Sequence, residues 1–247
     1  MKSLDGMSIL ITGGGSGIGF GTARHCIERG ARVTICGRRP DKIEAAADEL
    51  GPNCHGVAAD ITAASDRQKL IAATLEHGGQ IDALINNAGN MYRGAITELE
   101  ESSLQDIFNT NVIAAMLLTG LATPHLAQRE GAVIFVGSIH TRRAFPGASP
   151  YAATKAAVQG LTRVLAAELG EQKIRVNCLL PGAVFTEINQ RAGLMDDKTA
   201  LQRLEGMADL HALGRIGTTE EVAEAMAFLI CAEWGTGAMI DIDGGLG

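Results

Sequence analysis

Two side chains that could move a proton stand four residues apart in the segment 151–155, Tyr-Ala-Ala-Thr-Lys. Residues at positions i and i+4 share one face of a helix, so Tyr151 and Lys155 are expected to lie side by side. A phenol titrates near pH ~10, and a neighbouring ammonium favours the phenolate, so proton exchange moves closer to neutral pH. A tyrosine and a lysine at this spacing usually lie on the protein surface and have no catalytic role. The two residues become a candidate acid–base pair because Ser138 closes an apolar segment thirteen positions earlier.

A glycine-rich loop follows the first apolar segment, where residues 12–19 read Thr-Gly-Gly-Gly-Ser-Gly-Ile-Gly. Glycines at a strand-to-helix turn permit positive φ and let the backbone approach a phosphate, whose charge meets the free N–H groups of the helix start. An ordinary tight turn is the alternative. The position after the first strand favours binding of a dinucleotide pyrophosphate by Gly13, Gly15, Ser16, Gly17, Ile18 and Gly19.

The end of the second apolar segment discriminates between forms of the adenosine ribose. An acidic residue there binds free hydroxyls, whereas a basic one accommodates a 2′-phosphate. Gly37 occupies the acidic position and Arg38 and Arg39 follow, so NADP(H) is favoured and NAD(H) stays possible. The alternative is that both arginines only solvate a loop. Asp60, at the end of the third segment, either meets the adenine amino group or caps a helix that begins near Ala63.

Short apolar segments alternate with amphipathic ones along the chain. The helical spacing of segments such as 18–30 and 155–169 predicts crossover helices between strands. This alternation predicts an α/β, doubly wound (Rossmann-type), seven-stranded parallel sheet with helices on both faces, in one domain spanning 1–247. The irregular stretch 184–215 is predicted to be a substrate lid within that domain. The predicted strands are 8–12, 32–36, 55–59, 83–86, 132–137, 174–180 and 238–242.

Composition restricts the partners. Apolar residues make up 46% of the chain and aromatics 4%, which suits parallel strands under helices. A net charge of −7 argues against nucleic acid or an anionic membrane as a partner. The five cysteines have no ligand spacing, so neither a metal nor a disulfide is expected. The first residues lack the pattern of a signal peptide, which makes a cytoplasmic protein the expectation.

The motifs together resemble those of classical short-chain dehydrogenases/reductases, and the resemblance spans essentially the whole chain. They are the loop 12–19, Asn-Asn-Ala-Gly at 86–89, Asn111, Ser138, Tyr151 with Lys155, and Pro181-Gly182. The resemblance implies four catalytic residues. Tyr151 exchanges a proton with the substrate oxygen, Ser138 holds that oxygen, Lys155 also bonds the nicotinamide ribose, and Asn111 anchors a water.

The resemblance also implies further contacts and an assembly. The closing segment Ile-Asp-Ile-Asp-Gly-Gly at 240–245 resembles the family's last strand and turn, which often lie near a tetramer interface. The resemblance therefore implies a homotetramer. The implied additional cofactor-binding residues are Ile61, Asn87, Ala88, Gly89, Pro181, Gly182, Val184 and Thr186.

The expected activity is an NAD(P)(H)-dependent interconversion of a ketone or aldehyde and a secondary alcohol. A 3-oxoacyl-[acyl-carrier-protein] reductase shares the fold and catalytic residues and is the first alternative. A non-enzymatic dinucleotide-binding redox sensor is a remote one, since it would not need the Tyr–Lys pair.

The residues that select the substrate are open, because a fold does not set its substrate. Arg142 or Arg143 could hold an anionic group of the substrate, although solvent-facing loop charges are the plainer interpretation. The other candidates to line a substrate pocket are Met91, Tyr92, His140 and Phe145.

Overall fold

The computed structural model describes residues 1–186, 199, 202 and 204–247. Its centre is a seven-stranded sheet in the order β3-β2-β1-β4-β5-β6-β7, and all neighbouring strands are parallel. This confirms the predicted doubly wound sheet. Each observed strand end lies within one residue of the predicted one. The strands are β1 Ser8–Thr12, β2 Arg32–Gly37, β3 Cys54–Ala58, β4 Ala83–Asn86, β5 Ala132–Val136, β6 Arg175–Pro181 and β7 Met239–Ile242.

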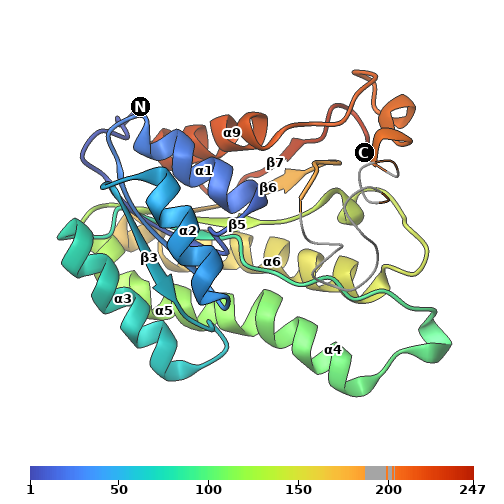
Figure 1. Cartoon of the computed structure of the whole chain (residues 1–247), viewed down its shortest axis with the longest axis horizontal. Coiled ribbons are helices and arrows are strands. Elements are labelled where there is room, and N and C mark those ends of the chain that lie inside the picture. Colours follow the sequence, from blue (N-terminus) through green and yellow to red (C-terminus); the bar gives the residue numbers. More distant parts are fainter. Residues whose placement is uncertain (187–198, 200–201, 203) are drawn as a thin grey trace.

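Helices cover both faces of the sheet (Figure 1). One face carries α1 (Gly17–Ile27), α2 (Pro40–Leu50) and α9 (Thr219–Cys231), whose buried side chains form one core with the sheet. The opposite face carries α3 (Ala64–Gly78), α5 (Ala114–Ala127) and α6 (Ser149–Glu168), which build a second core. The helix α4 (Glu101–Phe108) precedes α5 and also contacts α6. Because both faces are covered, the central strands β1 and β5 are buried along their whole length.

Strand order places the loops that carry the candidate residues at one edge. The chain winds outward from β1 to β3 and then returns to β4 on the other side of β1. Loops that follow the carboxyl ends of β1 and β4 therefore separate to opposite faces and leave a crevice between them. The loops after β5 and β6 open on the same edge, because all strands are parallel.

The helical stretch Glu101–Ala127 is long and apolar enough, by length and composition, to cross a membrane. Its apolar content has another use in this fold. Leu118, Ala122 and Leu126 are fully buried and belong to the core between the sheet and its helices. Packing against the sheet thus accounts for the buried part of its apolar content.

Candidate active site

The glycine loop is fastened to the loop after β4. Asn87 donates its side-chain N–H groups to the carbonyls of Thr12 (2.9 Å) and Gly13 (3.1 Å), and the Thr12 hydroxyl accepts from the backbone of Asn87 and Ala88. Gly13 has φ +68°, a conformation that side chains disfavour. A Cβ on Gly19 would lie 2.4 Å from the Gly13 carbonyl oxygen, so Gly19 serves close packing of helix α1 on the loop. The bare backbone fits the pyrophosphate of a dinucleotide.

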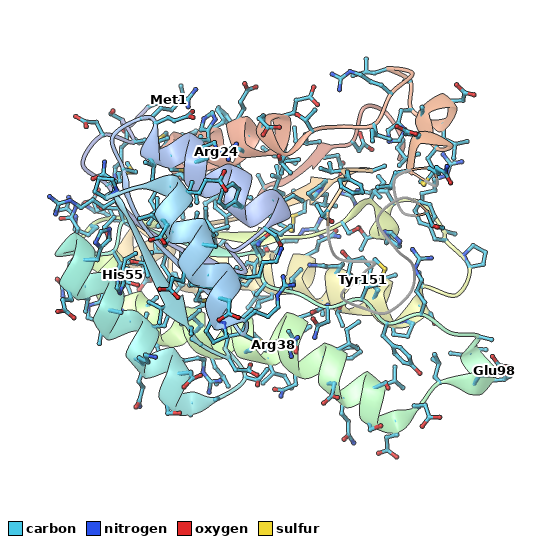
Figure 2. The ribbon with its side chains drawn as sticks, in the orientation of Figure 1. Met1, Arg24, Arg38, His55, Glu98 and Tyr151 are labelled. Atoms are coloured by element: carbon cyan, nitrogen blue, oxygen red, sulfur yellow. The ribbon has the colours of Figure 1, made fainter. Side chains whose placement is uncertain are left out.

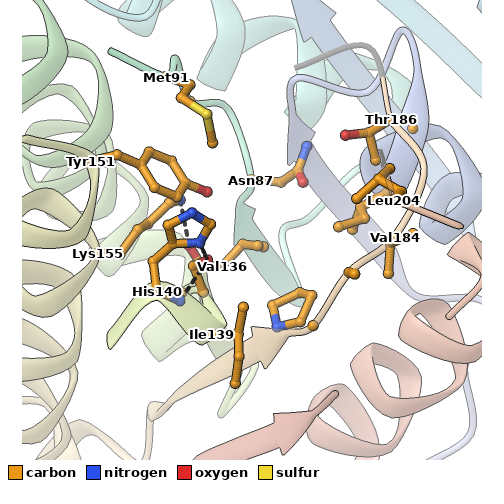
Figure 3. Close-up of a pocket in the computed structure, with 18 of the residues that line it drawn as sticks. Asn87, Met91, Val136, Ile139, His140, Tyr151, Lys155, Val184, Thr186 and Leu204 are labelled. Carbon is orange, nitrogen blue, oxygen red and sulfur yellow. Dashed lines mark hydrogen bonds between the residues drawn. The ribbon is translucent and has the colours of Figure 1, made fainter. Parts of the chain in front are cut away.

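Helix α6 brings Tyr151 and Lys155 together, as their spacing predicts. The Lys155 ammonium donates to the Val136 carbonyl at the end of β5 (2.7 Å) and lies 5.6 Å from the Tyr151 ring centroid. Lys155 is buried, and because burial disfavours the ammonium, its pKa is lowered to about 8. The Tyr151 ring packs in a small cluster with Met91 and Ile107, and its hydroxyl points into a cavity (Figure 3).

Ser138 stands where β5 ends and is 6% exposed. It begins a 3-10 turn, Ile139–Thr141, and its Oγ accepts from the backbone N–H of His140 (3.3 Å). The His140 ring turns back so that Nδ1 lies 3.1 Å from the same Oγ. His140 also meets the Tyr151 ring edge-on at a centroid distance of 5.1 Å. Ser138 and Tyr151 therefore approach the cavity from two elements with an imidazole between them (Figure 3).

Asn111 lies behind the cavity, in a π-helical turn, Asn109–Ile113, between α4 and α5. Its amide is 3% exposed, accepts from the Asn90 backbone N–H (2.8 Å), and donates to the Asn90 carbonyl (3.0 Å) and the Thr154 hydroxyl (3.0 Å). The π turn turns this side chain toward the loop after β4 and toward α6. Asn111 thus joins the loop after β4 to the helix that carries Tyr151 and Lys155. Its expected water-anchoring role stays a prediction.

One cavity joins these parts. It is partly open to solvent, and both polar and apolar side chains line it, as is usual for a ligand site. Three basic side chains and, among the described residues, no acid line it. The predicted residues it brings together are Gly13, Ser16, Gly17, Ile18, Asn87, Ala88, Gly89, Met91, Ser138, His140, Phe145, Tyr151, Lys155, Pro181, Gly182, Val184 and Thr186.

Comparisons with known proteins agree with this geometry. The family model for the short chain dehydrogenase matches residues 7–197. An L-fucose dehydrogenase from Bos taurus is 36% identical over 245 residues, which cover 97% of this chain and 89% of that protein. Dehydrogenase/reductase SDR family member 4 from Homo sapiens is 33% identical over 244 residues, with 96% and 86% covered. The chain belongs to the short-chain dehydrogenase/reductase family.

Solved structures of this family superimpose over almost the whole chain. A crystal structure of a 3-ketoacyl-(acyl-carrier-protein) reductase from Brucella melitensis, complexed with NADH, has a TM-score of 0.89 at 33% identity and covers 99% of each chain. A short-chain dehydrogenase/reductase of unknown function from Caenorhabditis elegans, solved with cofactor, has a TM-score of 0.92 at 30% identity and covers 98% of this chain and 96% of that one.

The arginines expected to hold an anionic substrate group do not line the cavity of this dehydrogenase/reductase. Arg142 pairs with Asp241 (3.1 Å), and Arg143 donates to the Leu246 carbonyl (3.2 Å). Both are held by the C-terminal segment, which sequence spacing does not locate. Among the described residues, the guanidinium that lines the cavity belongs to Arg93, two residues after the predicted Met91. In the described structure neither Arg142 nor Arg143 is placed to hold a group bound in this cavity, and their role toward a substrate stays a prediction.

The sequence-based prediction did not name several apolar lining residues individually, although Leu204 and Met207 fall within its predicted lid, 184–215. Leu204, Met207 and Leu246 line the cavity together with Ile139 and Ala183, and these five residues belong to one apolar cluster. They come from far along the chain and carry no local motif. Tyr92, a predicted neighbour, is not among the lining residues: it packs against the cluster of Met91 and Tyr151, and its hydroxyl accepts a hydrogen bond from the Glu100 backbone (2.8 Å).

A second hollow lies beside the glycine loop, where the adenosine half of a dinucleotide is expected. Gly13, Gly15 and Ser16 line it together with Arg38 and Arg39, and the exposed Lys42 on α2 adds a third cation. Arg38 directly follows β2, at the carboxyl end of this strand. In Figure 2 Arg38 and Tyr151 both lie to the right of His55. This hollow fits an anionic group next to the glycine loop.

Two predicted cofactor-binding residues, Asp60 and Ile61, are not among the residues that line these two hollows. The Asp60 carboxylate accepts from the backbone N–H (2.9 Å) and the hydroxyl (2.7 Å) of Thr62, so it closes a turn and does not cap the helix, whose N-cap is Ala63. Ile61 is buried in the core. Of the predicted lid 184–215, residues 187–198, 200–201 and 203 lie outside the described residues, while Val184, Thr186, Leu204 and Met207 line the main cavity.

Proposed function

We propose that this protein is an NAD(P)(H)-dependent oxidoreductase that interconverts a ketone or aldehyde and a secondary alcohol, with Tyr151 as acid and base. The observation that carries the proposal is the meeting of Tyr151, Lys155 and Ser138 in the cavity that the glycine loop also lines. Family membership supports the reaction class, and the positions of these side chains around the cavity support the residue roles.

The nicotinamide, when bound, supplies or accepts the hydride at the substrate carbon. In the reductive direction Tyr151 donates its hydroxyl proton to the oxygen that becomes the alcohol, and in the oxidative direction it takes that proton back. The Lys155 ammonium stabilises the phenolate that remains, because it is held nearby by the Val136 carbonyl in a region of low dielectric. Ser138 donates a hydrogen bond to the same substrate oxygen and so orients it toward Tyr151.

We also propose that NADP(H) is the preferred cofactor. Arg38 stands directly after β2, where a carboxylate would repel a 2′-phosphate, and Arg39 and Lys42 border the same hollow. A guanidinium can donate two parallel N–H groups to a phosphate, and the two groups carry opposite charges. The free 2′-hydroxyl of NAD(H) carries no charge, so it gains less from the same contact.

Parallel titrations with NADPH and NADH test the cofactor proposal, read by cofactor fluorescence. Arg38→Ala is expected to weaken NADPH binding by roughly 10- to 100-fold and to leave NADH binding almost unchanged, since a charged hydrogen bond contributes about 1.5–3 kcal/mol. Arg32→Ala is the matched control, because this exposed arginine stands at the opposite end of the same strand. Equal loss for both cofactors, or tighter NADH binding by the unmodified protein, would contradict the preference.

Reduction of a 3-oxoacyl thioester is the second candidate activity. The similarity to the Brucella melitensis reductase, and to a second structure described as a putative betaketoacyl-ACP reductase at a TM-score of 0.85, favours it. Activity on an acyl-carrier-protein thioester well above that on free ketones would select this candidate, and the reverse order would select a free carbonyl compound.

We further propose a homotetramer. The helix face formed by Ile113, Met116, Leu117 and Leu121 is exposed, although its spacing of three and four residues is that of a packed apolar stripe. Sedimentation equilibrium of the purified chain tests the assembly, and Leu117→Lys is expected to weaken it. A monomer at micromolar concentration would contradict the proposal.

A further inference from the structure

His140 lies between Ser138 and Arg93 and contacts both of them. Its Nδ1 lies 3.1 Å from Ser138 Oγ, and its Nε2 lies 3.2 Å from a terminal nitrogen of the Arg93 guanidinium. The ring is held between Phe145, at a centroid distance of 4.4 Å, and the edge of Tyr151. Arg93, His140 and Ser138 thus form a chain along the cavity wall, and all three line the cavity.

The chemistry of the donors determines where the imidazole proton sits. A guanidinium has only N–H donors, so the nitrogen that faces it, Nε2, must offer a lone pair. A neutral imidazole carries its single N–H on the other nitrogen, which here is Nδ1. That N–H then donates to Ser138 Oγ. The opposite tautomer would direct an N–H at the Arg93 guanidinium and would leave that contact repulsive.

The Ser138 hydroxyl can then act only as a hydrogen-bond donor to a further group. A hydroxyl has two acceptor lone pairs and one proton. Both lone pairs are used, because Oγ faces the backbone N–H of His140 (3.3 Å) and the Nδ1 of the same residue. The Ser138 proton is therefore free to be donated into the cavity, where the Tyr151 hydroxyl also points (Figure 3).

We propose that His140, held in its Nδ1–H form by Arg93, is a positioning residue that makes Ser138 a dedicated hydrogen-bond donor to the substrate oxygen. The inference rests on the proposed function, because it concerns the same oxygen that Tyr151 protonates. A donor aimed in advance at this oxygen stabilises the negative charge that develops there as hydride reaches the carbon. With the other tautomer, Ser138 would donate to His140 and be lost to the substrate.

The tautomer can be observed without turnover. Long-range ¹H–¹⁵N correlation spectra of protein labelled at histidine nitrogens distinguish Nδ1–H from Nε2–H, and the signal absent from His140→Asn assigns residue 140. The unmodified protein is expected to show Nδ1–H. Arg93→Met is expected to lose that preference, and Arg93→Lys, which restores a donor-only cation, to regain it. An Nε2–H signal in the unmodified protein would overturn the inference.

Kinetics test the effect on Ser138. His140→Asn keeps an N–H donor near the Nδ1 position and should retain kcat within about threefold, whereas His140→Leu fills the space without a donor and should lose roughly 10- to 100-fold in kcat. Cofactor binding should be unchanged in both. In a Ser138→Ala background, His140→Leu should cause no further loss, because its effect passes through the missing hydroxyl.

The outcomes separate the inference from the proposed function. Equal losses for His140→Asn and His140→Leu, or additive losses in the Ser138→Ala background, would refute a positioning role even in an active enzyme. If the protein binds a dinucleotide but reduces no carbonyl compound, the proposed function fails, and the tautomer spectra still decide the state of His140. Should His140→Leu fail to fold, His140→Asn and the two Arg93 variants carry the test.

Discussion

The buried ammonium of Lys155 is expected to lower the free energy of unfolding of the protein. Burial lowers the pKa of this side chain from 10.5 to about 8, which corresponds to roughly 3 kcal/mol against folding at neutral pH. Lys155→Met keeps a side chain of similar length without a charge. It loses the hydrogen bond to the Val136 carbonyl, about 1 kcal/mol. The variant should therefore be more stable than the unmodified protein by about 2 kcal/mol at pH ~7, although it is catalytically impaired.

The dependence on pH identifies the cause. Between pH ~8 and ~10.5 the unfolded chain holds a proton on Lys155 that the folded chain has released, so the unmodified protein gains about 1.4 kcal/mol per pH unit relative to the variant. Below pH ~8 the lysine is protonated in both states, and the penalty is present in full. Near pH ~9.5 the advantage of Lys155→Met should have disappeared.

Thermal unfolding of both proteins without cofactor, at pH ~7 and pH ~9.5, measures this difference. A stability gain of 2 kcal/mol should raise Tm by about 4–8 °C for a chain of this size. Lys69→Met is the matched control, because Lys69 is exposed on α3 and should show no comparable pH-dependent change. A lower Tm for Lys155→Met at pH ~7, or a difference that does not change with pH, would refute the reasoning.

Four further outcomes are expected. Tyr151→Phe should lower kcat by roughly 10²- to 10⁴-fold with cofactor binding intact, and steady-state rates beside a cofactor titration check this. Gly19→Ala should abolish dinucleotide binding, because its Cβ would strike the Gly13 carbonyl. Gly120→Ala should raise the free energy of unfolding by about 0.5–1 kcal/mol, because a Cβ at this position of helix α5 meets nothing within 4 Å. Arg175→Met removes the donor to the carbonyls at the end of α9, and denaturant unfolding should show a loss of about 2–3 kcal/mol; an unchanged midpoint would contradict that role.

Local signals in the sequence determined the sheet and the catalytic pair. Period-two and period-3.6 patterns, with glycines at the turns, are properties of neighbouring residues, so strand ends could be predicted within one residue. Tyr151 and Lys155 share a helix, and helical spacing alone sets their mutual position. Ser138 and the glycine loop followed from the rule that parallel strands end at one edge.

The tertiary structure decided which charges face the cavity. Arg142 looked suitable because it follows Ser138 closely, but Asp241, ninety-nine residues later, holds it away. Arg93 lines the cavity instead, and its guanidinium contacts the His140 ring. The burial that lowers the Lys155 pKa and the Asn90 and Thr154 partners of Asn111 likewise depend on segments distant in sequence. Such contacts arise from packing between elements, which the pattern within each element does not contain.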